Sequence, residues 1–179
     1  VGTTASAGQG GAITFGIVGG SGSATVDSTT GLVMGVSVGT VTLTASSSGD
    51  SNYGPASVSQ LITVGAGPQT LTITSSNAAL VGDSLTATVS TTALSGGGTY
   101  SYSIVNGSGS ALVNPSTGLI NMISAGTVTL TVSSSGDSNY NGASVSQLIT
   151  ISRGGQTLTI NSSSSMYVDQ VLSASVSTT

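Results

Sequence analysis

Few side chains in this 179-residue chain could carry out acid–base or nucleophilic chemistry. It has 36 Ser and 27 Thr hydroxyls, but no His, Lys, Glu or Cys. The charged residues are five aspartates and one arginine: Asp27, Asp50, Asp83, Asp137, Asp169 and Arg153. An activated Ser or Thr needs a neighbouring base, and general acid–base catalysis commonly uses His, Glu or Lys. The sequence therefore predicts that this protein is not an enzyme.

The same composition argues against metal and cofactor sites. Zinc, copper and iron are bound mainly through His and Cys, which the chain lacks. Two acidic–amide clusters exist, Asp50 with Asn52 and Asp137 with Asn139. Calcium takes about six to eight oxygen ligands, so one Asp and one Asn are too few. We expect these Asp side chains to accept hydrogen bonds from turn amides instead, and we predict no metal and no cofactor.

The charge balance points away from nucleic acids and from membranes. The formal net charge is −4 and only 3% of the residues are charged, against about 25% in an ordinary soluble domain. Nucleic acids and anionic membrane surfaces are both bound through several Lys or Arg side chains. No apolar run approaches the roughly 18 residues of a transmembrane segment. Because 37% of the chain is nevertheless apolar, we expect it to fold.

The chain repeats itself with a period of 87 residues. Residues 30–64 and 117–151 align without a gap and are identical at 26 of 35 positions. Between the repeated runs, Gly and Pro in residues 65–68 are typical of a linker. The predicted organisation is a partial unit over residues 1–65, a complete unit over 66–152 and the first part of a further unit over 153–179.

Apolar side chains recur at every second position within each unit. Leu71 and Ile73 alternate with Thr, as do Val128 and Leu130. This period is typical of strands with one buried and one exposed face. A complete unit holds about seven such segments, which fits an immunoglobulin-like sandwich of antiparallel strands. The predicted fold class is therefore all-β, with tandem immunoglobulin-like β-sandwiches.

Residues 24–45 and 111–132 share the motif Gly-Leu-(Val/Ile) followed by Gly-Thr-Val-Thr-Leu-Thr. These two segments resemble the signature of bacterial immunoglobulin-like domains of the invasin and intimin type, group 2, which occur as tandem repeats in surface proteins. The resemblance implies a bacterial source and an extracellular or cell-surface location. It also implies a spacer, stalk or adhesive role without catalytic residues.

The register of the outer units predicts an assembly. With the strands of a unit lettered A to G, residues 1–65 supply C to G and residues 153–179 supply A and B, so each piece leaves an apolar face uncovered. The expected interface residues are Leu158, Ile160, Leu172, Ala174 and Val176 on one side and Ile13, Phe15 and Ile17 on the other. Strand addition from a second copy would build a head-to-tail filament. The other explanation is that the chain is a segment of one long repeat protein.

These expectations favour a non-catalytic structural repeat of a secreted or cell-surface fibre, whose partner is another copy of itself. The alternative is an adhesin segment that binds a glycan or a partner protein through loops such as 91–98 and 106–110. Loops 4–11 and 91–98 differ strongly between the copies, which fits either relaxed constraint or specialised binding. Regular filaments in electron micrographs would support the first function, and a dose-dependent glycan-array signal the second.

Overall fold

The structure is a computed structural model that describes residues 10–94 and 96–179. Every regular element in these residues is a β-strand. They contain no helix that is long and apolar enough to cross a membrane. The beginning of the predicted unit 1–65, most of loop 4–11 and one position of loop 91–98 lie outside the described residues.

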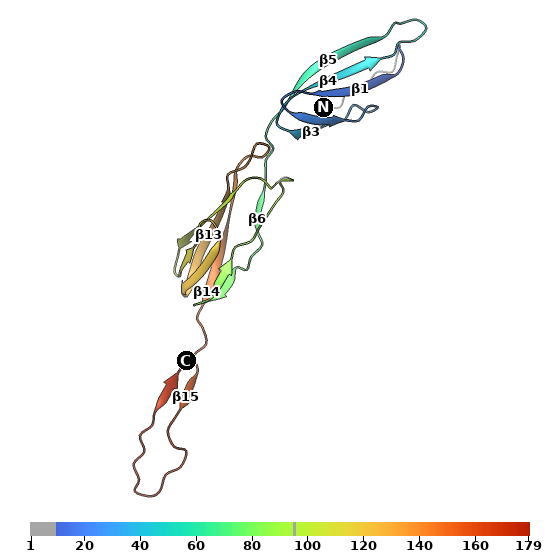
Figure 1. The fold of residues 1–179 in the computed structure, drawn as a ribbon. Coiled ribbons are helices and arrows are strands. Elements are labelled where there is room, and N and C mark those ends of the chain that lie inside the picture. Colours follow the sequence, from blue (N-terminus) through green and yellow to red (C-terminus); the bar gives the residue numbers. More distant parts are fainter. Residues whose placement is uncertain (1–9, 95) are drawn as a thin grey trace. The chain divides into compact units, whose positions relative to one another are not determined.

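The first copy of the repeat forms two small antiparallel sheets. Its strands are β1 (Ile13–Gly19), β2 (Ser23–Val26), β3 (Val33–Ser37), β4 (Gly39–Ser47) and β5 (Ala56–Val64). One sheet has the order β1-β4-β5, and β2 pairs with β3 in the other, as Figure 1 shows. The ladder between β4 and β5 runs without a register shift from Gly39 opposite Val64 to Ser47 opposite Ala56. Period-2 alternation therefore puts one face of this sheet inward along its whole length.

The second copy repeats these strands and adds four more ahead of them. The added strands are β6 (Leu71–Ile73), β7 (Ala78–Leu80), β8 (Ser84–Thr86) and β9 (Val89–Thr91). The repeated strands are β10 (Tyr100–Asn106), β11 (Ser110–Val113), β12 (Leu119–Ser124), β13 (Gly126–Ser134) and β14 (Ala143–Ser152). Each of these five begins 87 residues after its counterpart in the first copy, except β12, which begins one residue earlier.

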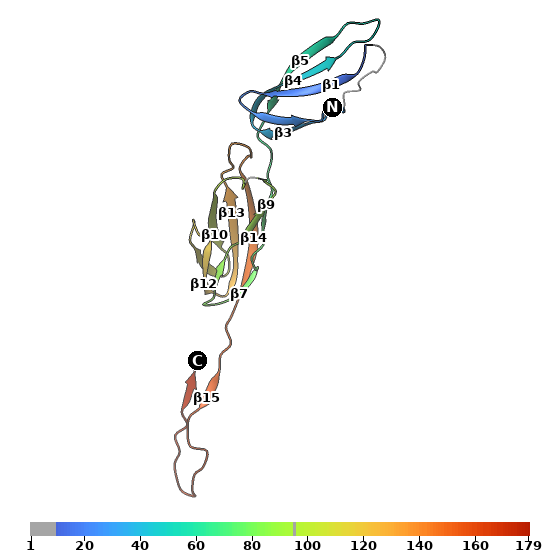
Figure 2. The same cartoon turned by 45° about the vertical axis from the view of Figure 1, so that its right-hand side comes forward.

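The sheets of the second copy form an immunoglobulin-like β-sandwich, which confirms the predicted fold class. One sheet has the order β10-β13-β14-β7, another has the order β11-β12-β8, and β6 pairs with β9 (Figure 2). The prediction of exclusively antiparallel strands is wrong at one place, because β7 runs parallel to β14 with Ala78 opposite Thr150. The strands β6 and β7 are separated by four residues, and they belong to different sheets: β6 pairs with β9, whereas β7 joins β14.

The core of the second copy consists of aliphatic side chains from the central strands. The largest fully buried ones are Ile120, Val128, Leu130, Val132, Ile149 and Ile151. Tyr102 packs over Gly118, whose φ is +71° and where a Cβ atom would lie 2.9 Å from the tyrosine ring. The first copy repeats this contact with Phe15 over Gly31. Both the backbone angle and the space therefore require glycine at this position.

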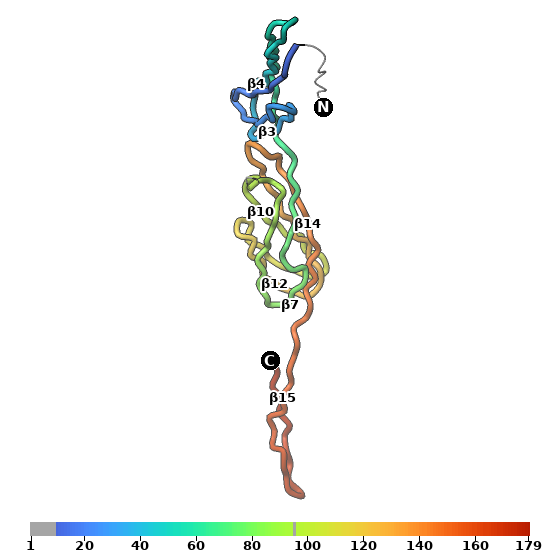
Figure 3. The backbone as a smooth tube through the Cα atoms, turned by 90° about the vertical axis from the view of Figure 1, so that its right-hand side faces the viewer, coloured from blue at the N-terminus to red at the C-terminus, as the bar shows by residue number. Residues whose placement is uncertain are grey.

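Residues after Ser152 form a separate hairpin of β15 (Leu158–Ile160) and β16 (Val176–Thr178). Its ladder places Leu158 opposite Thr178 and Ile160 opposite Val176. The bounds of β15 and β16 are those of β6 and β9 shifted by 87 residues. Figure 3 shows the chain passing from β14 into this hairpin. The counterparts of β7 and β8, residues 165–167 and 171–173, are not strands and belong to no sheet.

By proximity of Cα atoms the chain gathers into two compact units. The first takes in the chain up to Thr72 together with Val89–Ser101 and Val132–Val145, and the second takes in Ile73–Thr88, Tyr102–Thr131 and Ser146–Thr179. This division passes through β6, β10, β13 and β14 rather than between copies of the repeat. The domain boundaries at residues 65 and 152 therefore remain predictions from the sequence repeat.

Candidate assembly surface

The predicted interface residues of the C-terminal hairpin lie in solvent. Leu158 is 64% exposed, Ile160 72% and Val176 57%, and Leu172 and Ala174 are exposed as well. Their counterparts in the second copy are Leu71, Ile73, Val89, Leu85 and Ala87, all of which are buried or half-buried. Leu71, for example, is only 4% exposed. The same sequence positions are therefore covered in one copy of the hairpin and uncovered in the other.

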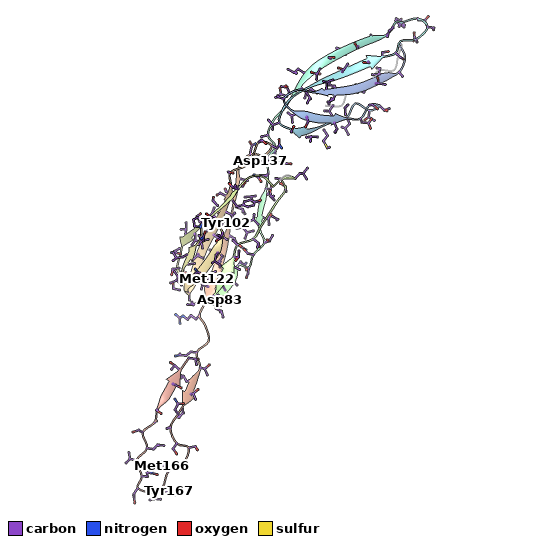
Figure 4. The ribbon with its side chains drawn as sticks, in the orientation of Figure 1. Asp83, Tyr102, Met122, Asp137, Met166 and Tyr167 are labelled. Atoms are coloured by element: carbon purple, nitrogen blue, oxygen red, sulfur yellow. The ribbon has the colours of Figure 1, made fainter. Side chains whose placement is uncertain are left out.

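The turn at residues 167–170, between β15 and β16, keeps the hydrogen bond of its counterpart at residues 80–83. In the second copy, the backbone N–H of Leu80 donates to the Asp83 carboxylate at 2.9 Å. In the hairpin, the N–H of Tyr167 donates to Oε1 of Gln170 at 3.0 Å. Met166 and Tyr167 lie in this loop (Figure 4), and both side chains are exposed. The turn of the hairpin is therefore formed although the apolar side chains of the hairpin are exposed.

The first copy leaves the complementary face partly open. Leu43, Ala45 and Ile62 are half-buried, whereas their counterparts are the fully buried Leu130, Val132 and Ile149. The predicted residues on β1 differ less from their counterparts. Ile13 is 36% exposed and Phe15 and Ile17 are half-buried, as are Tyr100, Tyr102 and Ile104 in the second copy.

The deficit in burial therefore lies mainly on β4 and β5, which the sequence-based set of interface residues omitted. The signal was present in the sequence, since these strands have the same period-2 alternation as β13 and β14 and lie in the best-conserved part of the repeat. The alternation identifies the inward face but does not measure how far that face is covered.

A groove marks one end of this open face. It has a volume of about 230 Å³ and lies beside the last residues of β4 and the first residues of β5. Its lining consists of Ile13, Ala45, Ser46, Ser47, Ala56, Ser57 and Val58. The apolar members lie on the inward-facing positions of their strands, so an aliphatic side chain from outside the first copy could be accommodated there.

In the second copy, the corresponding end of the sandwich holds the buried side chain of Gln69. Its Nε2 donates to the carbonyls of Gly97 and Asn141, both at 2.8 Å, and contacts the Ser134 hydroxyl at 3.2 Å. Its Oε1 accepts a hydrogen bond from the Thr91 hydroxyl at 3.0 Å. Gln69 and Ser134 are both buried, and the amide is satisfied on both sides. Such a fully paired polar group stabilises one arrangement of the strands around it.

The first copy contains the acceptors of this network without the glutamine. Ser47, the counterpart of Ser134, donates its hydroxyl proton to the Gly10 carbonyl and accepts the N–H of Gly49 at 3.2 Å. Gly10 and Gly54 are the counterparts of Gly97 and Asn141. The counterpart of Gln69 would precede Val1 and lies outside this sequence, whereas Gln156 of the C-terminal hairpin is the next copy of it.

The two acidic–amide clusters form turns, as predicted. Asp50 Oδ1 accepts the N–H groups of Asn52 and Tyr53 at 2.7 and 2.8 Å, and Oδ2 accepts that of Gly10 at 3.0 Å. These hydrogen bonds, above all that from Asn52, lower the pKa of Asp50. Asp137 makes the same turn in the second copy. Within residues 10–94 and 96–179, no group of three or more acidic, His or Cys side chains could hold a metal ion.

The fold and this surface define the chain as tandem immunoglobulin-like β-sandwich repeats, of which one is closed and one is open along a sheet face. No protein family model matches the sequence, and no curated protein matches it. Solved structures with similar features include the EC21-23 fragment of human CDH23, at 21% identity and a TM-score of 0.37, covering 75% of this chain and 50% of that one.

Two further similar structures come from a surface-located, SusE-like polysaccharide binding protein of Bacteroides thetaiotaomicron and from a C-terminal fragment of intimin. The first is 14% identical with a TM-score of 0.37, covering 79% of this chain and 29% of that one. The second, solved with the intimin-binding domain of its receptor Tir, is 17% identical with a TM-score of 0.33, covering 86% and 55%. This chain therefore spans about half or less of each structure's length. With TM-scores below 0.5, inferences about its function rest on its own residues.

Proposed function

We propose that this chain is a non-catalytic structural repeat of a secreted or cell-surface fibre. In this fibre, the C-terminal hairpin of one chain completes the open sandwich of the next chain. The observation that carries the proposal is the contrast between equivalent positions. Leu71 is 4% exposed, because residues 69–91 are packed into a sandwich. Its counterpart Leu158 is 64% exposed, because the equivalent residues 156–178 are not packed into one. The open face of β4 and β5 shows the same deficit on the other side.

Two physical arguments support docking of the hairpin on that face. Covering apolar surface on both partners is favourable because it removes that surface from water. The hairpin already has the β15–β16 ladder and its turn, so little further backbone entropy is lost on binding. When the contact repeats, the C-terminal hairpin of each chain binds the N-terminal repeat of another chain, which generates an open, head-to-tail polymer.

The test is the assembly state of the 179-residue chain. We expect analytical ultracentrifugation at micromolar concentration to show concentration-dependent polymers, and electron microscopy to show filaments. Leu158→Ser should abolish them, whereas the matched variant Leu148→Ser should not, because Leu148 is a similarly exposed leucine, at 58%, that lies outside the hairpin. A well-folded, protease-resistant monomer at these concentrations would refute the proposal.

The location and source that we propose follow from the sequence resemblance. The segments 24–45 and 111–132 resemble bacterial immunoglobulin-like repeats of surface proteins, and this resemblance supports a bacterial source and an extracellular or cell-surface location. Immunoprobing of intact against lysed cells of the source organism tests this, and a signal confined to lysed cells would contradict it.

One observation favours an adhesin function as the second candidate. Leu94 is 95% exposed on loop 91–98, although its backbone is anchored by an N–H donated to the Tyr140 hydroxyl at 3.1 Å. The exposed side chain of Leu94 is thus available for an apolar contact with a partner. If loop 91–98 binds a glycan or a partner protein, a glycan or surface-protein array should give a dose-dependent signal that Leu94→Ser removes.

A further inference from the structure

We propose that Gln156 of one chain inserts its amide among Gly10, Ser47 and Gly54 of the next chain. This buried contact sets the register in which the hairpin docks on the sheet. The inference rests on the proposed function, because it requires the hairpin to dock on the open face. Beyond that function, Gln156 is assigned a binding surface on the next chain and the role of fixing the alignment of the hairpin on the sheet.

The first argument is the geometry of the equivalent site in the second copy. The Gln69 amide is bound by groups from three separate segments: Gly97 before β10, Ser134 at the end of β13 and Asn141 before β14. Because the three acceptors lie on different segments, only one position of the amide is within hydrogen-bond distance of all of them. A hairpin shifted along the sheet would bury the amide away from them, and a buried amide without partners is strongly unfavourable.

The second argument is that the first copy is already built to receive the amide. Ser47 is bonded to Gly10 and Gly49 as Ser134 is to Gly97 and Gly136. A Cβ atom on Gly97 would lie 2.1 Å from Oε1 of Gln69. Among residues 10–94 and 96–179, a Cβ atom on Gly10 would meet nothing closer than the Ser47 hydroxyl at 3.8 Å. None of these described residues therefore fills, beside Gly10, the volume that Gln69 fills in the closed copy.

The third argument is a matched change of chemistry at positions that face each other. In the second copy, Ser84 of β8 lies opposite Asn121 of β12, and their side chains share a hydrogen bond of 2.8 Å. The counterparts are Val171 in the hairpin and Met34 on β3, so both members of the pair become apolar together. A polar pair that changes into an apolar pair is expected when the two positions touch in both cases.

A matched change of size occurs around the last inward residue of β14. Ile151 lies opposite Ala79 in the parallel ladder. Its counterpart Val64 would lie opposite Met166, so a small residue is replaced by a large one in the hairpin. In compensation, buried Met122 is replaced by Gly35, where a Cβ atom would lie 2.9 Å from the Val64 side chain. The methionine lost from one side of Val64 is regained from the hairpin on the other side.

A second polar contact requires the same register. Nε2 of Gln147 points to the Ser75 carbonyl at 3.4 Å in the second copy. Both members recur unchanged, as Gln60 on β5 and Ser162 in the hairpin. Gln156 and Ser162 are six residues apart, as are Gln69 and Ser75, so one placement of the hairpin satisfies both contacts.

The experiment combines a glutamine variant with cysteine pairs, because the chain has no cysteine of its own. In the second copy, Thr150 lies opposite Ala78, so the proposed register puts Thr63 of one chain opposite Ser165 of the chain before it in the polymer. Oxidation of the Thr63→Cys/Ser165→Cys double variant should give covalent multimers on non-reducing gels. The pair Thr63→Cys/Tyr167→Cys, which is two residues out of register, should form no disulfide between chains and should run as single chains on the same gels.

Introducing Gln156→Leu should raise the dissociation constant of the copy–copy contact about 10- to 100-fold and let the out-of-register pair cross-link. Asn161→Leu is the control. It also replaces an exposed amide by leucine on the same hairpin, at a position whose counterpart, Thr74, stays exposed in the closed copy. The control should leave both the dissociation constant and the cross-linking pattern unchanged.

The outcomes separate this inference from the proposed function. If the chain polymerises, but Gln156→Leu keeps the wild-type dissociation constant and cross-links only in register, the role of Gln156 is overturned and the fibre function stands. If the wild-type chain does not associate at all, both are overturned. Cross-linking of the out-of-register pair in the wild-type background would also refute the register.

Discussion

The most direct test of hairpin docking compares two leucines that occupy the same position in the repeat. Leu71 is 4% exposed and belongs to the closed copy, whereas Leu158 is 64% exposed and belongs to the free hairpin. Leu71→Ala should therefore weaken folding of a single chain. Leu158→Ala should leave single-chain folding unchanged and weaken association between chains.

The size of each effect follows from the change in burial. Replacing a buried leucine by alanine costs about 2–5 kcal/mol, which is the expected loss in the free energy of unfolding for Leu71→Ala. At an exposed position the loss should stay within about 0.5 kcal/mol. If Leu158 becomes as buried as Leu71 on docking, about three-fifths of its surface is removed from water. Full burial of a leucine side chain contributes about 1.5–3 kcal/mol, so this fraction contributes about 1–2 kcal/mol to association. The dissociation constant should then rise by about 5- to 30-fold.

The two quantities are measured separately. Urea unfolding, followed by circular dichroism at a concentration below the dissociation constant, reports the stability of the single chain. Sedimentation velocity over a concentration series reports association. The wild-type chain, Leu158→Ala and Leu71→Ala are compared in the same buffer, so that only the position of the deleted side chain differs.

Two results would refute the reasoning. If Leu158→Ala lowers the stability of the single chain as much as Leu71→Ala does, the hairpin is already packed within its own chain. If Leu158→Ala leaves the dissociation constant unchanged while the wild-type chain associates, the contact between copies does not involve this face of the hairpin.

Three further predictions concern the fold itself. Gly118→Ala should lower the melting temperature by several degrees, because a φ of +71° is unfavourable by about 1–2 kcal/mol for alanine and the new Cβ would press on Tyr102; an unchanged melting temperature would contradict the contact. The pKa values of Asp27 and Asp50 are lowered by hydrogen bonds from turn amides, led by those of Thr30 and Asn52, so their contribution to stability should be complete above about pH 5 and lost as the pH falls below about 4. Urea midpoints measured across this range should be flat from about pH 5 to 9, and a decline in the neutral range would show that other groups matter. Neither calcium nor EDTA should shift the melting temperature, and a calcium-dependent rise would reveal an ion site that the turn aspartates alone do not explain.

Much of the fold could be predicted from the sequence because strand signals here are local and repeated. The alternation of Val128, Leu130 and Val132 with threonine gives both the strand and its inward face. The 87-residue offset reproduces the bounds of β15 and β16 from those of β6 and β9. What alternation could not predict was the parallel pairing of β7 with β14. The change of sheet after Ile73 depends on which edge is available in three dimensions, and no local pattern encodes that.

The candidate surface could be predicted only in part for a related reason. Leu158 and Ile160 stand out in sequence as a strand without its partners, and the structure finds them exposed. The role of Leu43 and Ile62 was missed, because their inward pattern looks the same whether or not another strand covers them. Gln69 was missed as well, since a glutamine between Pro68 and Thr70 reads as an ordinary loop residue. Its burial depends on Gly97 and Asn141, which are far from it in sequence.

The distribution of charge explains why a buried amide should carry the specificity of such an assembly. The charged side chains lie in turns or in the segment after β14: Asp27, Asp50, Asp83, Asp137, Asp169 and Arg153. Asp50 accepts the N–H of Gly10 beside the proposed Gln156 site, but the proposed contact between the hairpin and the sheet of β4 and β5 pairs none of the six with a charge of opposite sign. Charge pairs, which in many interfaces select the partner and the register, therefore have no part in this one.

Apolar burial can supply affinity for the contact, but it is non-directional and tolerates a shift of the hairpin along the sheet. A polar group that is satisfied in one alignment and unsatisfied in all others supplies the discrimination that is missing. Salt should consequently have little effect on the assembly, whereas cooling should weaken it, because the hydrophobic contribution decreases at low temperature. Sedimentation at about 0.05 and 1 M salt, and at about 4 and 25 °C, distinguishes this from an ionic contact, which would be lost in salt and retained in the cold.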